Sequence, residues 1–221
     1  MKSFLLLSFM LFIGAQLWAL PETSVDVTTI ENQTDNISVI SSDTSDVNTG
    51  VNAIGDIDVK SSEIKNANSD VSSEALGNSK INTGIEIENS SVASSKITNA
   101  NTDVVNKADA NSDIVSGVSI KDSEIKTSKL DNSNDKVTNT AQNNSEINSG
   151  LVSQGSTIKE SKLSSSVGKT QSLADNKSKV NTGIKISNSA VKNSNFTNAG
   201  GNSSIITKDD SKANTGINIG E

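Results

Sequence analysis

The sequence predicts an all-β protein, a β-solenoid of six repeats of about 33 residues stacked as rungs. The first observation is a glycine that recurs after one step of 34 residues and then four steps of 33, with a hydroxyl residue before it and an aliphatic residue after it. The recurring glycines are Gly50, Gly84, Gly117, Gly150, Gly183 and Gly216. A fixed period in this range is typical of a chain in which each unit buries its apolar face only against its neighbours.

Two aliphatic columns in the same register are the second observation. The first column contains Val92, Ile125, Ile158 and Val191, and the second contains Ile97, Leu130, Leu163 and Phe196. Serine, asparagine and threonine dominate the composition and aromatic residues make up only 2%, a profile that alone indicates disorder. A disordered linker has no reason to hold aliphatic residues in register, so the columns favour a folded repeat, with disorder of the free monomer as an open alternative.

The segment around each glycine is the first predicted element of a unit. From Ser79 to Ile87, apolar or hydroxyl residues alternate with charged or amide residues and with Gly84. Period-two alternation is the pattern of a half-buried strand. We therefore expect one continuous strand through each glycine, with the hydroxyl residues pointing inward.

The next predicted elements are two short strands. Serine-x-aliphatic triplets follow each other at a spacing of five, as in Ser90-x-Val92 and Ser95-x-Ile97, which predicts three-residue strands joined by two-residue corners. Asparagine tolerates left-handed backbone, and we expect it at the corner after the second strand, at Asn32, Asn66, Asn99, Asn132 and Asn198. The remaining residues of each unit are polar and variable, so we expect them to form a less regular side of the coil. One weak apolar column recurs there, at Val71, Val104, Val137 and Ile205.

Strands this short need neighbours, so each coil is expected to stack on the next at about 4.8 Å per rung. One rung per repeat is the preferred geometry, and two smaller rungs per repeat are the alternative. Helical repeats are disfavoured because β-branched residues, serine and asparagine form helices poorly.

The chain divides into a predicted signal peptide, residues 1–19, and a repeat domain, residues 20–221. Lys2 supplies the positive charge, residues 4–13 the apolar stretch, and Ala19 the small residue before cleavage. We expect the protein to be secreted to the cell surface or the extracellular space. The repeats are expected at residues 20–53, 54–87, 88–120, 121–153, 154–186 and 187–219.

Both ends of the repeat domain are expected to lack caps. We place Leu20 and Ile219 in the column of Ile87, so that the domain holds a whole number of turns. Free-standing solenoids usually carry polar caps that prevent pairing of their end strands. The residues expected to join one molecule head to tail to the next are Leu20, Val25, Ile30, Thr215, Ile217 and Ile219. Fraying of both ends, or cover by another protein, is the alternative.

Composition argues against several classes of function. Histidine, arginine, tyrosine and cysteine are absent, and the net charge is −7, which disfavours nucleic acid as a partner and removes the usual general base and thiolate ligands. No segment after the signal peptide is apolar enough to span a membrane. The aspartate pairs at 56/58 and 209/210 lack calcium-loop patterns. We expect no catalytic residues, no cofactor and no metal site.

The signal peptide, the Ser/Asn-rich repeats and the absence of cysteine resemble the subunits of bacterial secreted functional amyloids of the curlin and Fap types. The resemblance covers residues 20–221 and lies in architecture and composition, because glutamine is scarce here and the Fap cysteine motif is missing. It implies a structural role in an extracellular fibre or biofilm matrix, with the chain itself as partner and a secretion or nucleation apparatus beside it. A monomeric or surface-tethered solenoid that acts as an adhesin is the alternative.

Overall fold

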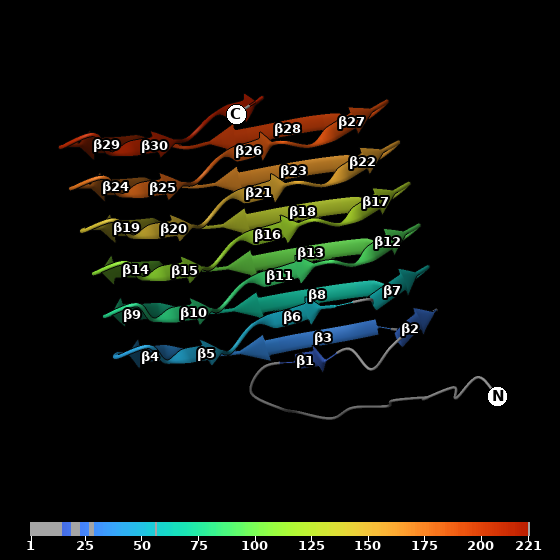
Figure 1. The fold of residues 1–221 in the computed structure, drawn as a ribbon, viewed down its shortest axis with the longest axis horizontal. Helices are drawn as coiled ribbons and strands as arrows, with labels where there is room; N and C mark the ends of the chain where they lie inside the picture. The colour runs from blue at the N-terminus through green and yellow to red at the C-terminus, as the bar shows by residue number, and fades with distance from the viewer. Residues whose placement is uncertain (1–14, 19–22, 27–28, 56, 221) are drawn as a thin grey trace.

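The computed structural model describes residues 15–18, 23–26, 29–55 and 57–220, and the side chains from residue 29 on. The described residues form 31 strands, and every pairing between these strands is parallel. Each strand from β1 to β26 pairs with the strand five places later, and in one such pair Ile97 lies opposite Leu130, so one coil takes one repeat (Figure 1). The β-solenoid is confirmed, and the alternative of two rungs per repeat is wrong.

The strands form five sheets that run along the stack. Sheet A consists of β1 (Ala15–Trp18), β6 (Val51–Ile54), β11 (Ile85–Glu88), β16 (Val118–Lys121), β21 (Leu151–Gln154), β26 (Ile184–Ser187) and β31 (Ile217–Ile219). Sheet B consists of β2 (Thr23–Asp26), β7 (Ile57–Lys60), β12 (Ser91–Ala93), β17 (Glu124–Lys126), β22 (Thr157–Lys159) and β27 (Ala190–Lys192). Sheet C consists of β3 (Thr29–Thr34), β8 (Glu63–Asn68), β13 (Lys96–Asn101), β18 (Lys129–Asn134), β23 (Lys162–Val167) and β28 (Asn195–Gly200).

The remaining two sheets complete each coil. Sheet D consists of β4 (Ser38–Ser41), β9 (Ser72–Leu76), β14 (Val104–Asp109), β19 (Val137–Ala141), β24 (Thr170–Ala174) and β29 (Ser203–Thr207). Sheet E consists of β5 (Asp46–Asn48), β10 (Lys80–Asn82), β15 (Asp113–Val115), β20 (Glu146–Asn148), β25 (Lys179–Asn181) and β30 (Lys212–Asn214).

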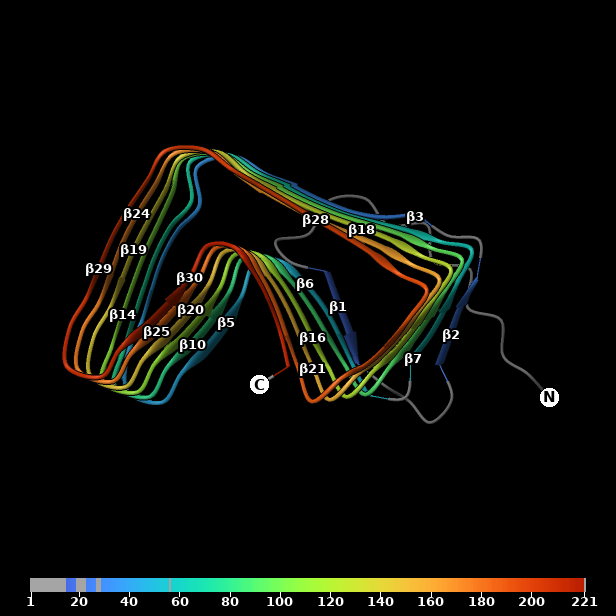
Figure 2. The same ribbon diagram turned by 90° about the horizontal axis from the view of Figure 1, so that it is seen from above.

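Seen along the stack, each coil has two lobes (Figure 2). Sheets A, B and C enclose the first lobe, whose core contains the ladders through Ile87, Val92 and Ile97. Sheets D and E enclose the second lobe, whose cores contain the ladders through Ile114 and Val104. Burial of like residues in register accounts for the columns in the sequence, because each aliphatic side chain packs on its counterpart in the next rung.

The glycine column marks a bend between two strands, so the prediction of one continuous strand is wrong. β10 ends at Asn82 and β11 begins at Ile85, and the chain turns at Gly84. Ile81 therefore lies in the core of the second lobe, while Ile85 lies in the core of the first. The hydroxyl residues before the first five glycines are buried, as predicted, with Thr83 at 0% exposure, and Thr215 before the last glycine is half-buried.

Close stacking is the reason that this bend needs glycine. A Cβ atom on Gly117 would lie 2.0 Å from the carbonyl oxygen of Gly150 in the next rung, and one on Gly84 would lie 2.1 Å from that of Gly117. Real Cβ atoms do not approach backbone this closely, so any side chain at the bend would force neighbouring rungs apart.

The serine corners are confirmed, but the predicted second strand and asparagine positions are wrong. Ser90 and Ser95 are buried, and Asn89 and Ser94 adopt positive φ at the corners. The second strand, β13, has six residues instead of three, and Asn99 lies inside it with 0% exposure. The backbone there is extended because the side chain bonds within the core, as described below.

The side predicted to be looser is a regular sheet, sheet D, and the apolar column predicted for it is wrong at its upper end. Val104 and Val137 are in register, but the next members are Thr170 and Ser203. Ile205 lies two positions later, in the column of Asn139 and Ser172.

Candidate functional site

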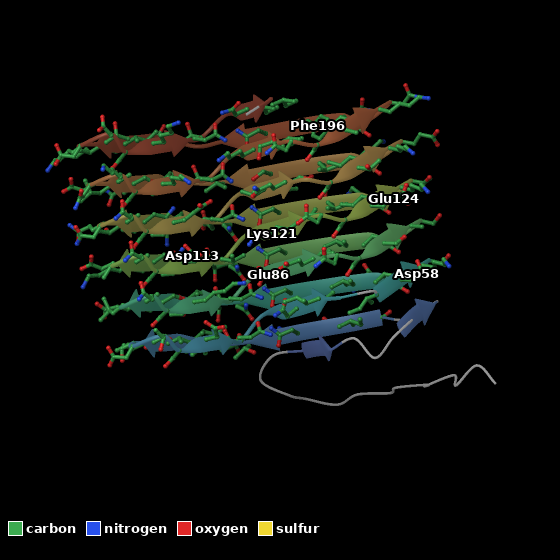
Figure 3. The ribbon with its side chains drawn as sticks, viewed as in Figure 1. Asp58, Glu86, Asp113, Lys121, Glu124 and Phe196 are labelled. Atoms are coloured by element: carbon green, nitrogen blue, oxygen red, sulfur yellow. The ribbon has the colours of Figure 1, made fainter. Side chains whose placement is uncertain are left out.

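The two end coils are the surfaces on which the repeat stops. Among the described residues, no strand pairs with the upper edges of β27–β31 or with the lower edges of β1–β5. Side chains that are fully buried in inner rungs are open at the top: Ile158 is 0% exposed, but Val191 above it is 38% exposed. Ile217 and Ile219 are 46% and 56% exposed. Phe196 is partly buried against the core at the upper end of its ladder (Figure 3).

The predicted end residues fall into the expected columns with one exception. Val25 pairs with Val59, and Ile30 pairs with Ile64 and packs against the core. Ile219 pairs with Ile186, which leads down to Ile87 as predicted. Thr215 lies at the bend before Gly216, and its carbonyl accepts a hydrogen bond from the Asn198 amide at 2.8 Å.

Leu20 lies outside the described residues, and its predicted column belongs to another residue. The register places Ala53 below Ile87 and Leu17 below Ala53. The prediction is wrong because it assumes a step of 33 residues between Leu20 and Ala53, whereas the register gives a step of 36 residues, from Leu17 to Ala53. The lowest strand of sheet A is therefore β1, which lies within the predicted signal peptide.

Sheet D shows that the two end coils differ from the inner coils in the same way. Its inward column is polar in the middle of the stack, at Ser73, Asn106, Asn139 and Ser172, but begins with Val39 and ends with Ile205. The adjacent outward column begins with Ile40, which is 70% exposed, and ends with Ile206, which is 53% exposed. Apolar residues thus face the open ends in columns that are otherwise polar or mixed.

Charge at the ends is also complementary. In sheet B one column begins with Asp26 at the bottom and ends with Lys192 at the top. In sheet E a column begins with Asp46 and ends with Lys212. Within the molecule Lys192 pairs with Lys159 and Lys212 pairs with Lys179, so each upper lysine is adjacent to a like charge. Like charges directly opposite each other destabilise a sheet.

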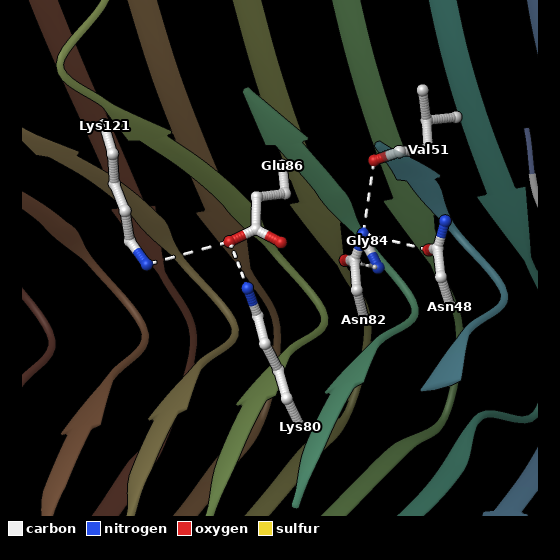
Figure 4. A network of polar contacts seen from close by, with 7 residues as sticks. All are labelled: Asn48, Val51, Lys80, Asn82, Gly84, Glu86 and Lys121. Atoms are coloured by element: carbon white, nitrogen blue, oxygen red, sulfur yellow. Dashed lines mark hydrogen bonds and ion pairs between the residues drawn. The ribbon is translucent and has the colours of Figure 1, made fainter. Parts of the chain in front are cut away.

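An asparagine ladder in sheet E leaves one donor without a partner at the bottom of the stack. Asn82 Nδ2 donates to Asn48 Oδ1 at 3.1 Å (Figure 4). At the other end of the ladder, Asn214 Nδ2 donates to Asn181 Oδ1 at 2.8 Å. Asn48 Nδ2 is buried and has no hydrogen-bond partner among the described residues. Because each amide donates to the rung below, the acceptor that would complete the ladder is an asparagine one rung lower.

At the upper end of the stack, the last glycine of the column, Gly216, is not covered by another rung. A Cβ on Gly216 would meet nothing within 4 Å, whereas each of the five glycines below it is covered by the backbone of the next rung. No contact within a single molecule therefore requires glycine at position 216.

A buried carboxylate bridges sheets A and E on the concave side of the bend. Glu86 is 0% exposed, and its Oε1 lies 2.7 Å from Lys80 Nζ and 3.7 Å from Lys121 Nζ (Figure 4). Asp113 lies near this bridge and keeps substantial exposure, but neighbouring atoms remove part of its hydration. This desolvation, together with the charge of Glu146, raises the pKa of Asp113. The bridge joins the two lobes, and both lysines neutralise the carboxylate.

The outer corner between sheets B and C forms a shallow groove of about 710 Å³ along the stack. Lys96, Lys129 and Lys162 line it beside corner serines. Lys96 pairs with Glu63 at 2.9 Å, and this pairing lowers the pKa of Glu63 and raises the pKa of Lys96. Lys129 pairs with Asp131 at 2.6 Å. These pairs leave little excess charge in the groove.

Comparison with protein-family models, with curated proteins and with solved structures found no match to this chain. In the part of the chain that the structure describes, no helix of membrane-spanning length and apolarity occurs. The same residues contain no cluster of three or more acidic side chains arranged to hold a metal ion.

Sequence reasoning placed Ile217 and Ile219 at the upper end of sheet A, and Val25 and Ile30 at the lower ends of sheets B and C, but it missed the end residues of sheets D and E. Val39, Ile40, Ile205 and Ile206 form the apolar ends of sheet D, and Asn48 is the open end of the asparagine ladder. The signal was present in the sequence, because the inward column of sheet D is polar at Ser73, Asn106, Asn139 and Ser172 and apolar only in its first and last members, Val39 and Ile205. It was hidden by the wrong column assignment of Ile205.

Proposed function

We propose that this protein is a structural, self-assembling subunit whose molecules stack head to tail into amyloid-like fibres. The observation that carries the proposal is the complementarity of the two end coils. If β27–β30 of one molecule lie directly below β2–β5 of a second copy, Ile205 meets Val39, Lys192 meets Asp26, and Lys212 meets Asp46. Each of these contacts covers an exposed apolar group, or gives a lysine that has a like charge below it an opposite charge above it.

Hydrogen bonding supports the same arrangement. Asn214 of the lower copy would stand below Asn48 of the upper copy, where its Oδ1 can accept from the buried Nδ2 that lacks a partner among the described residues. A buried donor without an acceptor costs about 1–3 kcal/mol, so stacking would recover that energy at each junction. Gly216 would come under the bend at Gly50 and would acquire the steric role of the glycines below it.

Secretion and an extracellular or cell-surface fibre, with a biofilm or surface-matrix role, belong to the same proposal. Residues 1–19 support it through their signal-peptide pattern, and the Ser/Asn-rich repeats support it through their resemblance to curlin-type subunits. We propose no catalytic activity and no cofactor. Solenoid folds do host enzymes, so this part rests on the absence of histidine and on the neutralised carboxylate at Glu86.

Substitution of Gly216 tests the proposal. In the secreted form that begins at Leu20, Gly216→Ala should fold like the unsubstituted chain but fail to form fibres, because its methyl group would strike the Gly50 carbonyl of the next copy. Gly200→Ala is the matched control: it lies in the same coil with nothing within 4 Å, in a column that holds side chains such as Asn134 and Val167 in other rungs.

Circular dichroism would check the fold of both variants, and sedimentation with negative-stain electron microscopy would measure assembly. Fibres from the unsubstituted chain and Gly200→Ala but not from Gly216→Ala support the proposal. Monomers from the unsubstituted chain after long incubation at high concentration contradict it. A monomer that binds a surface or glycan through the groove at Lys96, Lys129 and Lys162 would then be the favoured function.

A further inference from the structure

We infer that β1 and the β31 strand of a second copy compete for one place, the lower edge of β6, so that β1 controls head-to-tail stacking. The inference rests on the proposed function and adds its regulation. It names the interaction surface as the β6 edge, Val51–Ile54, and its partner as the last strand of another copy of this chain.

The strand counts of the sheets are the first observation. Sheet A contains seven strands, whereas sheets B, C, D and E contain six each. The additional strand is β1, which pairs with β6 so that Ala15 lies opposite Val51 and Trp18 opposite Ile54. Sheet A therefore has one strand more than six coils need, with β1 at its lower end beside β2–β5 and β31 at its upper end above β26.

Stacking of two molecules brings β1 and β31 into conflict. When β27, β28, β29 and β30 of the lower copy lie under β2, β3, β4 and β5 of the upper copy, four sheets continue without a gap. In sheet A, β31 then arrives one rung below β6 of the upper copy. That is the place that β1 of the upper copy occupies, and neighbouring strands lie only about 4.8 Å apart, so one of the two must leave.

The register of β31 fits the β6 edge. Ile184 N donates to Gly216 O at 2.8 Å, and Val51 N donates to Gly84 O at 2.8 Å, which is the same bond in two rungs. Continued into a second copy, the Ile217 amide would donate to the Gly50 carbonyl. Asn218 would lie opposite Asn52, whose buried Oδ1 has no hydrogen-bond partner among the described residues.

β1 thus covers the lower edge of β6, the edge to which β31 of a second copy would bind. While β1 is paired, only molecules whose β6 edge opens can accept a second copy, so the apparent affinity falls in proportion to the open fraction. Loss of β1, or its displacement by β31 of another copy, allows all five sheets to continue.

A disulfide reporter in the full chain makes the competition measurable. The chain contains no cysteine, so Asn52→Cys with Asn218→Cys introduces only two thiols. In one molecule these positions lie five rungs apart, about 24 Å at the usual strand spacing, far beyond the reach of a disulfide. In stacked molecules they lie opposite each other on adjacent strands, and oxidation would link the copies into a ladder on a non-reducing gel.

Three versions of this reporter chain would be compared. The first has no further change, the second carries Gln16→Pro with Leu17→Pro, and the third carries Gln16→Thr with Leu17→Val. Proline cannot donate to a neighbouring strand and breaks the pairing of β1, while threonine and valine retain it. The proline version should form the ladder faster by on the order of tenfold, as expected if β1 covers about nine in ten of the β6 edges.

The outcomes separate the two claims. Equal rates of ladder formation in all three versions would overturn the competition but leave head-to-tail assembly intact. Fibres that lack the disulfide between the two introduced thiols would overturn the inferred edge. Neither ladder nor fibres in any version, including a chain that begins at Leu20, would overturn the proposed function and the inference together.

Discussion

At the residue scale, the glycine column shows that glycine can be required for lack of space alone. None of the six column glycines has positive φ, so an alanine there would be compatible with the backbone of its own rung. The obstacle is the carbonyl oxygen of the next rung, at 2.0–2.1 Å from an added Cβ at Gly50, Gly84, Gly117, Gly150 and Gly183. Glycine thus recurs once per repeat at the place where the backbones of successive coils come closest together.

This explanation predicts different effects for the same substitution at two positions of the column. Gly117→Ala should lower the free energy of unfolding by about 3 kcal/mol or more, the upper range for overpacking against backbone that cannot yield. Gly216→Ala should leave it almost unchanged in the monomer, because the space above it is open. Urea denaturation followed by circular dichroism measures both. Equal losses of stability at the two positions would show that glycine serves another purpose.

At the element scale, sheet C is attached to the glycine bend by side-chain amides. Asn99 Nδ2 donates to the Ser116 carbonyl at 3.0 Å and to Asn132 Oδ1 at 2.8 Å, and Asn66 Nδ2 donates to Asn99 Oδ1 at 2.7 Å. The amides therefore run both across the coil and along the stack. They satisfy carbonyls that the bend removes from strand pairing and that lie inside the molecule.

Removal of one amide should be costly. Asn99→Ala takes one amide partner from the Ser116 carbonyl and one acceptor from the Asn66 amide in the core, and we expect a loss of about 2–3 kcal/mol in the free energy of unfolding. Thr98→Ala is the control in the same strand, since the Thr98 hydroxyl has no hydrogen-bond partner among the described residues. Thermal denaturation would compare the two. A loss no larger for Asn99→Ala than for Thr98→Ala would refute a structural role of the ladder.

The sequence was sufficient to predict a solenoid with one coil per repeat, but not the two-lobed cross-section of the coil. The period, the parallel strands and the buried serines such as Ser90 could be predicted, because each follows from like residues in register. The bend at Gly84 could not, because Ile81 and Ile85 keep period-two spacing although they face different cores. Likewise, asparagine at a corner and asparagine in a buried ladder have the same spacing, and only the Ser116 carbonyl on a distant segment distinguishes them at Asn99.

At the scale of the whole molecule, the end coils decide whether the stack stops or continues. Inside the molecule the neighbour of Lys192 in its column is Lys159, and this like-charge contact does not favour a lysine there. A second copy would place Asp26 above it. The role of the end residues could have been predicted from the sequence only after every column was correctly aligned. An end residue is recognised only because it differs from the inner residues of its own column.

Charge reversal at the top coil separates folding from assembly. Lys192→Glu removes the like-charge contact with Lys159 and should leave the free energy of unfolding unchanged or slightly higher, by about a few tenths of a kcal/mol for an exposed pair. It should slow fibre growth, because glutamate would face Asp26 of the next copy, and added salt should reduce this difference. Growth followed by light scattering at low and high salt measures the effect. Growth as fast as that of the unsubstituted chain at low salt would contradict the proposed register.

The most direct test of head-to-tail stacking is a helical reconstruction of the fibres by cryo-electron microscopy. We predict a single continuous solenoid with strands perpendicular to the fibre axis, one molecule for each advance of about 29 Å, which is six rungs at the usual strand spacing. At each junction β31 of one molecule should lie directly below β6 of the next. Fibres in which molecules associate side by side, or with the two end coils left uncovered, would contradict the account.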